Sequence, residues 1–253
     1  MKAKDLLLLQ NYPSVLIYGP AGTGKTALVS QANNSYMFDF DDGMRTAALL
    51  EDKFTSLRQD CEFDTYKDSE PSKPTRWSAF TKKLFEFSKM SAKGKITHDG
   101  KDIDTIIVDS LSGMAKSMQL HIMYVATTDA FRKPQIQHWG DMVSEIEKCL
   151  TILRSLKCLL IVTAHEMDFE VDGINLIRPL SITEKHGKNK LAWLFDEVLH
   201  TSLRPAGMNK HKYMLSGHST TSILARTRSK MTEEIDVSEI GLAGVLEKIG
   251  YKK

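Results

Sequence analysis

The sequence predicts a doubly wound α/β fold, in which a mostly parallel sheet is covered by helices on both faces. Apolar runs of strand length alternate with amphipathic segments of helical spacing along most of the chain. The run at 158–164 is apolar almost throughout, as expected of a strand that is buried on both faces. The first strand leads directly into a glycine-rich turn and a helix, an order typical of phosphate-binding α/β proteins.

The composition is that of a globular protein, with 253 residues of which 42% are hydrophobic and 26% are charged. We find no linker and expect a single domain over 1–253. The net charge of +2 neither favours nor excludes nucleic acid as a partner. Cys61, Cys149 and Cys158 have no C-x-x-C spacing, so we expect no disulfide framework or zinc site, which fits the cytoplasm. No run approaches the ~20 apolar residues of a membrane span, and we expect no membrane contact.

The first part of the chain alternates between the two kinds of element. Trp77, Phe80 and Leu84 recur at helical spacing and predict an amphipathic helix. We expect a lead-in helix over 1–12, strands at 15–18 and 35–40, one short strand within 52–75, a helix over 76–91 and a loop or small hairpin over 93–101.

The remainder of the chain continues the alternation and then becomes polar after Glu166. We expect a strand over 104–110, a methionine-rich helix over 111–126 that packs in the core, a loop over 127–137, a helix from Trp139 to Leu153 and a strand over 158–164. Residues 191–203 predict a short helix and a strand. The segments 212–215 and 222–226 predict the two strands of a C-terminal hairpin, and 238–249 a closing helix. The nucleotide core would then span about 14–166, and the hairpin and helix about 191–253.

One stretch carries the chemistry of the site, because it matches the phosphate-binding pattern G-x-x-x-x-G-K-[ST] at every defined position. Its residues are Gly19, Pro20, Ala21, Gly22, Thr23, Gly24, Lys25 and Thr26. Glycines let successive backbone N–H groups turn inward around phosphate oxygens, and the following helix adds the positive end of its dipole. We expect Lys25 to reach the β- and γ-phosphates and the Thr26 hydroxyl to bind Mg²⁺.

Acidic residues follow two of the predicted strands. Asp109 ends the strand 104–110, where an acid can hold Mg²⁺ through water, although an acid there can also cap the next helix. Asp41 or Asp42 follows the strand 35–40 and could orient or deprotonate the attacking water, the alternative being a solvated acid in a turn. His165 ends the strand 158–164 and would face the γ-phosphate if that strand lies beside the Asp109 strand. It could otherwise be a capping or surface residue.

The order of these motifs resembles the RecA-like ATPase core, and in particular the small phage-encoded RecA-like ATPases, which include single-strand annealing proteins with a minimal recombinase core. Residues 38–43 resemble the recombinase stretch in which a Glu activates water, and by position Asp41 takes that role. Residues 105–110 are similar to the family's second nucleotide motif. Residues 160–165 look like the strand that ends on the γ-phosphate sensor, here His165. The resemblance covers about 14–230.

The resemblance implies an ATPase that uses ATP and Mg²⁺, forms a homo-oligomer and acts on single-stranded DNA in phage recombination or annealing. A single-strand binding protein would be a partner, and the location would be the cytoplasm of the host. Arg226 and Arg228 resemble the basic pair that recombinases send to the neighbour's ATP. They alternate on a predicted strand with no acid within two residues, so a neighbour's γ-phosphate could supply the anion between them, the alternative being a pair of solvated surface arginines.

Two segments lie where the family contacts DNA, one after the Asp109 helix and one after His165. Their basic residues are Arg132, Lys133, Lys185, Lys188 and Lys190. These side chains could neutralise phosphates while Phe131 or His186 stacks on bases, or the segments could be solvated loops. Two other functions remain open: a helicase loader or regulatory ATPase that acts on a protein, and a small-molecule kinase with the same phosphate loop.

Overall fold

The computed structural model describes residues 12–182, 191–207, 210–229, 231 and 233–251 and confirms the predicted fold class. The parallel strands lie in the spatial order β9, β1, β7, β6, β2, β3. Their bounds are β1 (Ser14–Gly19), β2 (Ser35–Asp39), β3 (Cys61–Thr65), β6 (Thr105–Asp109), β7 (Leu159–Val171) and β9 (Glu197–Pro205). The strand that precedes the phosphate loop and the strand that ends on Asp109 are therefore separated by β7.

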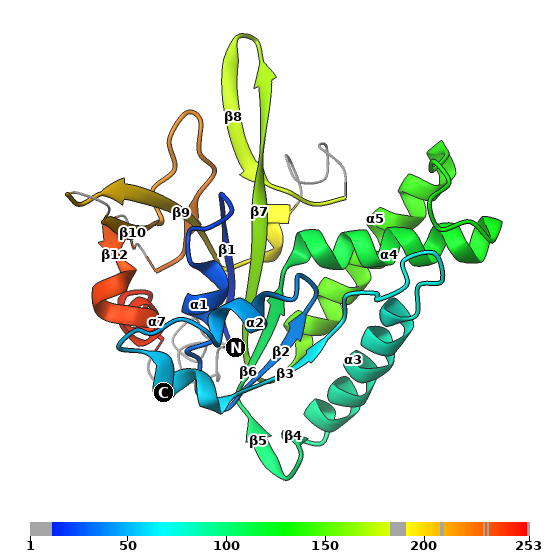
Figure 1. The fold of residues 1–253 in the computed structure, drawn as a ribbon, viewed down its shortest axis with the longest axis horizontal. Helices are drawn as coiled ribbons and strands as arrows, with labels where there is room; N and C mark the ends of the chain where they lie inside the picture. The colour runs from blue at the N-terminus through cyan, green and yellow to red at the C-terminus, as the bar shows by residue number, and fades with distance from the viewer. Residues whose placement is uncertain (1–11, 183–190, 208–209, 230, 232, 252–253) are drawn as a thin grey trace, which may run out of the picture.

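Helices cover both faces of this sheet (Figure 1). One face packs against α3 (Arg76–Ala92), α4 (Leu111–Thr127) and α5 (Ile136–Ser155), and the other against α1 (Lys25–Val29), α2 (Gly43–Ala47) and α7 (Val237–Lys248). The side chains of β1 show why, because Leu16 and Tyr18 join the first core while Val15 and Ile17 join the second. An apolar strand with both faces buried is the expected result.

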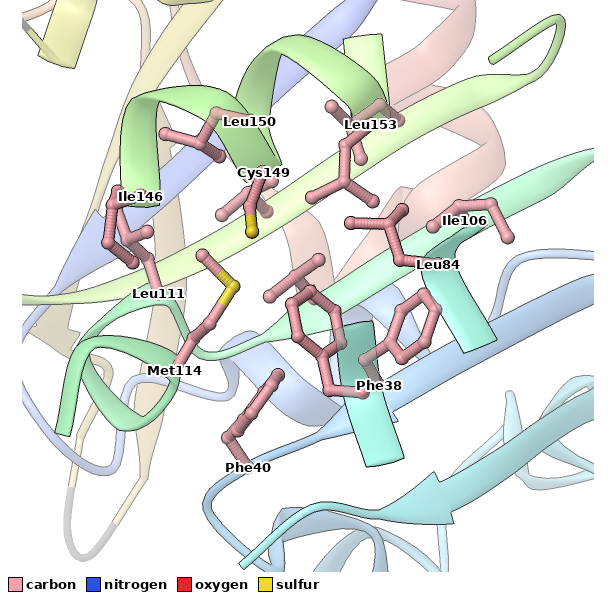
Figure 2. Packing of buried hydrophobic residues seen from close by; sticks show 14 of the residues in the cluster. Phe38, Phe40, Leu84, Ile106, Leu111, Met114, Ile146, Cys149, Leu150 and Leu153 are labelled. Carbon is pink, nitrogen blue, oxygen red and sulfur yellow. The ribbon is translucent and has the colours of Figure 1, made fainter. Parts of the chain in front are cut away.

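The larger core holds α4 firmly against the sheet. Figure 2 shows Leu84 of α3, Met114 of α4 and Leu150 of α5 gathered near Phe38 and Ile106 of the strands. Each of these side chains is fully or almost fully buried. Because α4 begins two residues after Asp109, this packing also fixes the end of β6 in space. The predicted core role of the methionine-rich helix is confirmed.

The elements expected up to residue 164 are confirmed within a few residues of their predicted bounds. The short strand within 52–75 is β3, which follows a 3₁₀ turn, η2 (Thr55–Asp60). The small hairpin after α3 consists of β4 (Ile96–His98) and β5 (Lys101–Ile103). The lead-in helix over 1–12 was predicted for a segment that lies outside the described residues, apart from position 12. None of the helices that the structure describes is long and apolar enough to cross a membrane.

The strand predicted to end near His165 is longer than expected. β7 continues to Val171, turns through Asp172 and Gly173, and returns antiparallel as β8 (Ile174–Pro179). Both turn residues have positive φ angles, 53° and 76°, which a tight two-residue hairpin requires. The prediction missed this extension because acids alternate with apolar residues from Asp168 onward. The acids made the segment look polar, so its strand pattern was not recognised. Figure 1 shows the resulting ribbon standing clear of the body.

The predicted pairing of 212–215 with 222–226 is wrong. β10 (His211–Ser216) pairs antiparallel with β9, and β12 (Glu234–Asp236) pairs with β10. The short β11 (Arg226–Thr227) also pairs with β9, at Val198 and Glu197. β9 follows a 3₁₀ turn, η3 (Leu191–Leu194), and is long enough to accept two partners one after the other. The C-terminal hairpin therefore exists, but its first strand is β9.

Candidate nucleotide site

The phosphate loop leaves β1 at Gly19 and is supported from behind by β9. A Cβ atom at Gly19 would lie 2.3 Å from Oγ1 of Thr201, so only glycine fits there without a shift of β9. The Thr23 hydroxyl hydrogen-bonds that of Thr201 at 2.7 Å. Gly22 and Gly24 have φ angles of 79° and 75°, which give the loop its inward curl before α1 begins at the next residue.

The Lys25 ammonium group lies inside this loop. Its Nζ donates hydrogen bonds to the carbonyl oxygens of Gly19 at 2.9 Å and Pro20 at 2.7 Å, and the residue is only 7% exposed. Burial lowers the pKa of Lys25, while the carboxylates of Asp109 and Asp41 act in the opposite direction. A cation that is largely removed from water attracts phosphate oxygens more strongly than an exposed one.

A hydroxyl and a carboxylate meet where Mg²⁺ was predicted. Thr26 Oγ1 donates to Asp109 Oδ2 at 2.6 Å, and the other carboxylate oxygen accepts a hydrogen bond from Thr163. Asp109 is 2% exposed, and burial raises its pKa to about 6. Ser110, and not Asp109, caps α4, because its side chain accepts the Gly113 N–H. The helix-cap alternative for Asp109 is therefore wrong, and its oxygens fit a hard cation such as Mg²⁺.

The three acids after β2 have different partners. Asp39 is buried and accepts backbone N–H groups from Asp41, Gly43 and Met44, so it shapes the turn. Asp42 is half-buried, does not line the cavity beside the phosphate loop, and pairs with the exposed Arg45 at 3.2 Å. Only Asp41, of these three, faces the site.

Asp41 is held by two donors. Its Oδ2 accepts a hydrogen bond from Ser110 Oγ at 2.6 Å and lies 3.3 Å from Nε2 of His165. Burial opposes ionisation of Asp41, but these hydrogen bonds outweigh it and the pKa lies below the usual value. The geometry therefore favours Asp41 over Asp42, as the resemblance implied, although its role in hydrolysis stays a prediction.

His165 lies on β7 between β1 and β6, opposite Gly19 in the register with β1. Its backbone N–H donates to Ser112 Oγ at 3.1 Å, and its imidazole points to Asp41. The condition set for a γ-phosphate sensor, a strand beside that of Asp109, is met. The sensor role itself stays a prediction.

These side chains line one cavity of about 570 Å³ beside the phosphate loop. Its polar lining includes Lys25, Thr26, Asp41, Asp109 and His165. A smaller cavity of about 270 Å³ adjoins it and shares Gly24, Ala27, Leu50 and Tyr213 with it. The two together offer room for a triphosphate and, beyond Gly24, for a base.

The sequence interpretation missed Thr163 and Tyr213. Thr163 belongs to a strand that was interpreted as apolar. A polar residue between Val162 and Ala164 could have indicated a role in the site. Tyr213 had no signal in the sequence, because only the pairing of β10 with β9 brings it beside Gly24.

Arg226 and Arg228 do not form the unpaired exposed couple that the sequence suggested. Arg226 Nη1 donates to the carbonyl of Ala192 at 3.3 Å and lies over the Trp193 ring. Arg228 pairs with Asp196 at 2.6 Å. Asp196 lies 32 positions before Arg228 in the chain, so the sequence around Arg228 could not predict this pair.

Both arginines lie at the amino ends of the parallel strands, whereas the phosphate loop follows the carboxyl end of β1. Asp196, the partner of Arg228, lies at this end too, because its backbone N–H donates to the carbonyl of Ser14, the first residue of β1. The arginines therefore do not reach the chain's own nucleotide site, and their predicted contact with a neighbour's ATP rests on the resemblance alone.

Of the residues predicted to bind DNA, Arg132 and Lys133 are exposed in the loop between α4 and α5, next to Phe131, which is 65% exposed. Lys185, His186, Lys188 and Lys190 lie outside the described residues. The ribbon that follows His165 is acidic, with Glu166, Asp168, Glu170 and Asp172 against Arg178. The described part of this segment is therefore not a basic DNA contact.

The fold and the site define a P-loop nucleotide-binding protein. A family described as "AAA domain" matches residues 11–229, and the chain belongs to this family. The protein is thus an AAA-type P-loop ATPase domain, a class for which ATP and Mg²⁺ are the expected ligands. The finer likeness to phage RecA-like proteins is not part of this match.

No curated protein matches the sequence. Among solved structures, the chain is similar to a prototypical ATPase from the type III secretion system of pathogenic bacteria, with 15% identity and a TM-score of 0.48. The alignment covers 76% of this chain, which spans about half (52%) of the length of that one.

Proposed function

We propose that this protein is a RecA-like ATPase that binds ATP with Mg²⁺, hydrolyses it, and acts on single-stranded DNA in recombination or annealing of the phage type. The observation that carries the ATPase part is the meeting of Lys25, Thr26, Asp109, Asp41 and His165 around one cavity. These residues come from four different strands or their connections, and only the observed sheet order brings them together.

Each residue has a distinct task in this mechanism. Lys25 neutralises phosphate charge from inside the loop, and backbone N–H groups of the loop and of α1 bind the remaining oxygens. Thr26 and Asp109 would hold Mg²⁺, which when bound neutralises charge on the phosphate oxygens. Thr163 fixes the Asp109 carboxylate so that its other oxygen faces Thr26.

Asp41 orients the attacking water. Its hydrogen bonds from Ser110 and His165 hold the carboxylate in one place, and its lowered pKa keeps it ionised at neutral pH. A carboxylate of low pKa is a weak base, so Asp41 positions the water first and accepts its proton late in the reaction. His165 contacts Asp41 and faces the same cavity, which makes it the side chain suited to register the γ-phosphate.

The DNA part rests on the resemblance and on the exposed Phe131, Arg132 and Lys133. Cationic side chains beside an exposed aromatic ring suit a single strand, whose bases are free to stack. Assembly as a homo-oligomer would place several such loops along one strand, and a single-strand binding protein would open the strand first. The setting would be the cytoplasm of a phage host.

The deciding experiment measures ATP turnover with and without single-stranded DNA. Stimulation supports the proposal, provided that Lys25→Ala abolishes turnover in both conditions. A companion assay follows the annealing of labelled complementary oligonucleotides, with and without a single-strand binding protein. Turnover that ignores DNA, together with no gain in annealing, would reject the DNA part.

A regulatory ATPase or loader that acts on a protein is the second candidate. The acidic ribbon favours it, because a projecting element that carries the exposed Asp168, Glu170 and Asp172 repels a phosphate backbone and suits a basic protein surface. Failure of both DNA assays would move this candidate to first place. The kinase alternative would instead require turnover that depends on a small acceptor.

A further inference from the structure

The turn of the β4–β5 hairpin brings a histidine and an acid next to the edge strand β3. Its two central residues, Asp99 and Gly100, have positive φ angles of 45° and 80°, as a tight two-residue turn requires. His98 and Lys101 pair across the hairpin directly before and after this turn, so their side chains lie on the same face. Both approach Glu62, the second residue of β3. Figure 1 shows the hairpin at the end of the molecule opposite to the β7–β8 ribbon.

One carboxylate oxygen of Glu62, Oε2, is buried without a hydrogen-bond partner in the part of the chain that the structure describes. The other oxygen, Oε1, accepts a hydrogen bond from Lys101 Nζ at 2.7 Å, which fixes the orientation of the group. Oε2 faces the imidazole of His98, but Nε2 lies 3.9 Å away, too far for a hydrogen bond. A buried carboxylate oxygen without a donor is costly, and a bound ion is one explanation for such an atom.

Three donor atoms converge at this point. Nε2 of His98 lies 3.9 Å from Glu62 Oε2 and 4.0 Å from Asp99 Oδ2, and one ligand atom of each residue lies within 4.8 Å of the other two. Atoms bound at about 2.0–2.2 Å to one Zn²⁺ ion lie roughly 3–4 Å from one another, so small side-chain rotations would complete the set. The Asp99 side chain is 83% exposed, so water can supply a further ligand.

Aromatic rings already hold the imidazole of His98 in place. The centre of the Tyr36 ring lies 4.8 Å from it at an angle of 85°, and that of Phe87 lies 6.2 Å from it at 73°. The Tyr36 hydroxyl is itself fixed by a hydrogen bond to Asp64. A ring whose orientation is set before binding loses little conformational entropy when it takes a metal ion.

The charges around this cluster balance, so a metal ion would be bound by the direction of the donor atoms and not by net charge. The carboxylates of Glu62 and Asp99 face the ammonium groups of Lys101 and Lys83. Lys101 uses Oε1 and leaves Oε2 open. Lys83 Nζ lies 3.4 Å from Nδ1 of His98 and favours the ring form that carries its proton on Nε2. Lys83 therefore competes with a metal ion at Nε2.

We propose that Glu62, His98 and Asp99 bind a divalent metal ion such as Zn²⁺ or Mn²⁺, through Glu62 Oε2, His98 Nε2 and a carboxylate oxygen of Asp99. Imidazole and carboxylate together suit these ions. The metal takes the place of the Nε2 proton, which moves to Nδ1 as Lys83 turns away. The ion would tie the hairpin to β3 near the amino ends of the parallel strands, whereas the phosphate loop follows the carboxyl end of β1. The site goes beyond the proposed function and does not depend on it.

The test titrates the full chain, without nucleotide, with ZnCl₂ in competition with a chromophoric chelator. The ligand variants are Glu62→Gln and His98→Gln, and Lys83→Met keeps the side-chain stem while it removes the competing charge. The matched controls are Asp102→Asn, an acid of the same hairpin outside the cluster, and His218→Gln, an exposed histidine elsewhere. Thermal unfolding of each protein in EDTA shows whether it is folded, and repetition with ZnCl₂ measures the stabilisation.

We expect Glu62→Gln and His98→Gln to weaken Zn²⁺ binding about 100-fold or more, because loss of a group that only orients a metal ligand already costs about 10–100-fold. Lys83→Met should bind Zn²⁺ more tightly. Zn²⁺ at about 100 times its dissociation constant should raise the unfolding temperature of the unmodified protein by roughly 5–10 °C. MnCl₂ should act at the same residues with lower affinity. The two controls should behave like the unmodified protein.

Three results would overturn the proposal. If the unmodified protein binds no more Zn²⁺ than the two ligand variants, Glu62 Oε2 faces water only. If binding is lost in Asp109→Asn instead, the metal ion lies at the phosphate loop. If Lys83→Met binds no more tightly, Nε2 of His98 is not a ligand. This last variant keeps all three ligands, so it decides the question even where a ligand variant fails to fold.

Discussion

Asp39, Asp41 and Asp42 lie within four positions of the chain and have three different surroundings. Asp39 is enclosed by backbone donors, Asp42 reaches Arg45 in solvent, and Asp41 faces Ser110 and His165. The residue type is the same in each case, so the difference in chemistry comes from the direction of each side chain at the end of β2.

We predict that Asp41→Asn keeps ATP bound but slows hydrolysis about 100-fold or more, because the water loses its positioned carboxylate. Asp42→Asn is the matched control and should turn over normally, since it removes only a solvent-exposed pair. Steady-state phosphate release, with binding of a fluorescent ATP analogue measured alongside, checks both. A slow Asp42→Asn and a normal Asp41→Asn would reverse the assignment.

The buried hydroxyl of Thr163 leads to a second prediction at this scale. Thr163→Val keeps the shape of the side chain but leaves one oxygen of Asp109 without its donor. We expect the concentration of Mg²⁺ that supports half-maximal turnover to rise about tenfold, as is common when a group that orients a metal ligand is lost. Thr163→Ser retains the hydroxyl and should retain the Mg²⁺ dependence. Equal Mg²⁺ curves for all three proteins would show that Thr163 does not orient Asp109.

At the scale of elements, β10 contributes Tyr213, a side chain that no sequence motif predicted. Its pairing with β9 sets Tyr213 against the phosphate loop, where a Cβ on Gly24 would lie 3.2 Å from the ring. The ring borders both the phosphate cavity and the smaller cavity next to it. It therefore lies where the base of a bound nucleotide would pass.

We predict that Tyr213→Ala weakens ATP binding about fivefold, in line with roughly 1 kcal/mol for an aromatic contact. Binding of inorganic triphosphate, which has no base, should not change. Tyr213→Phe keeps the ring and serves as the control. Competition titrations against a fluorescent ATP analogue measure all the affinities. Equal losses for ATP and triphosphate would mean that the ring supports the loop and does not contact the base.

Element order and the phosphate loop could be predicted because they depend on short-range patterns. The runs at 15–18 and 158–164, and the spacing of Trp77, Phe80 and Leu84, are local signals of burial. Partners distant in sequence could not be predicted in the same way. Asp196 next to Arg228, and β9 as the partner of β10, follow only from the completed sheet. The β7–β8 ribbon could have been predicted from the alternation of apolar and acidic residues from Met167 to Val171. The acids led instead to its interpretation as a polar segment.

At the scale of the whole molecule, the question is whether Arg226 and Arg228 act on a neighbouring subunit. Arg228 has a partner in its own chain, so a loss of activity on its removal could reflect the lost pair with Asp196. A useful experiment has to separate the positive charge from the pair.

We predict that Arg226→Ala/Arg228→Ala protein is inactive alone and regains part of its turnover when mixed with Lys25→Ala protein. Mixed assemblies contain interfaces that join an intact phosphate loop to intact arginines. Asp196→Asn breaks the pair but keeps both arginines, and should stay active. Turnover of each mixture at fixed total protein gives the answer. Loss of activity in Asp196→Asn, with no recovery in the mixture, would make the arginines structural.

The path of β7 has a mechanical consequence. One uninterrupted strand passes beside the phosphate loop at His165 and continues to Val171 at the ribbon tip, and β8 pairs with it from Ile174 to Pro179. Six residues of extended chain span about 20 Å, so a tilt of about 10° at His165 would swing the tip by about 3 Å. The pairing of β7 with β8 continues without a break from Glu166 to Val171, directly after His165. Under the proposed sensor role of His165, loss of the γ-phosphate would displace the ribbon tip further than His165 itself.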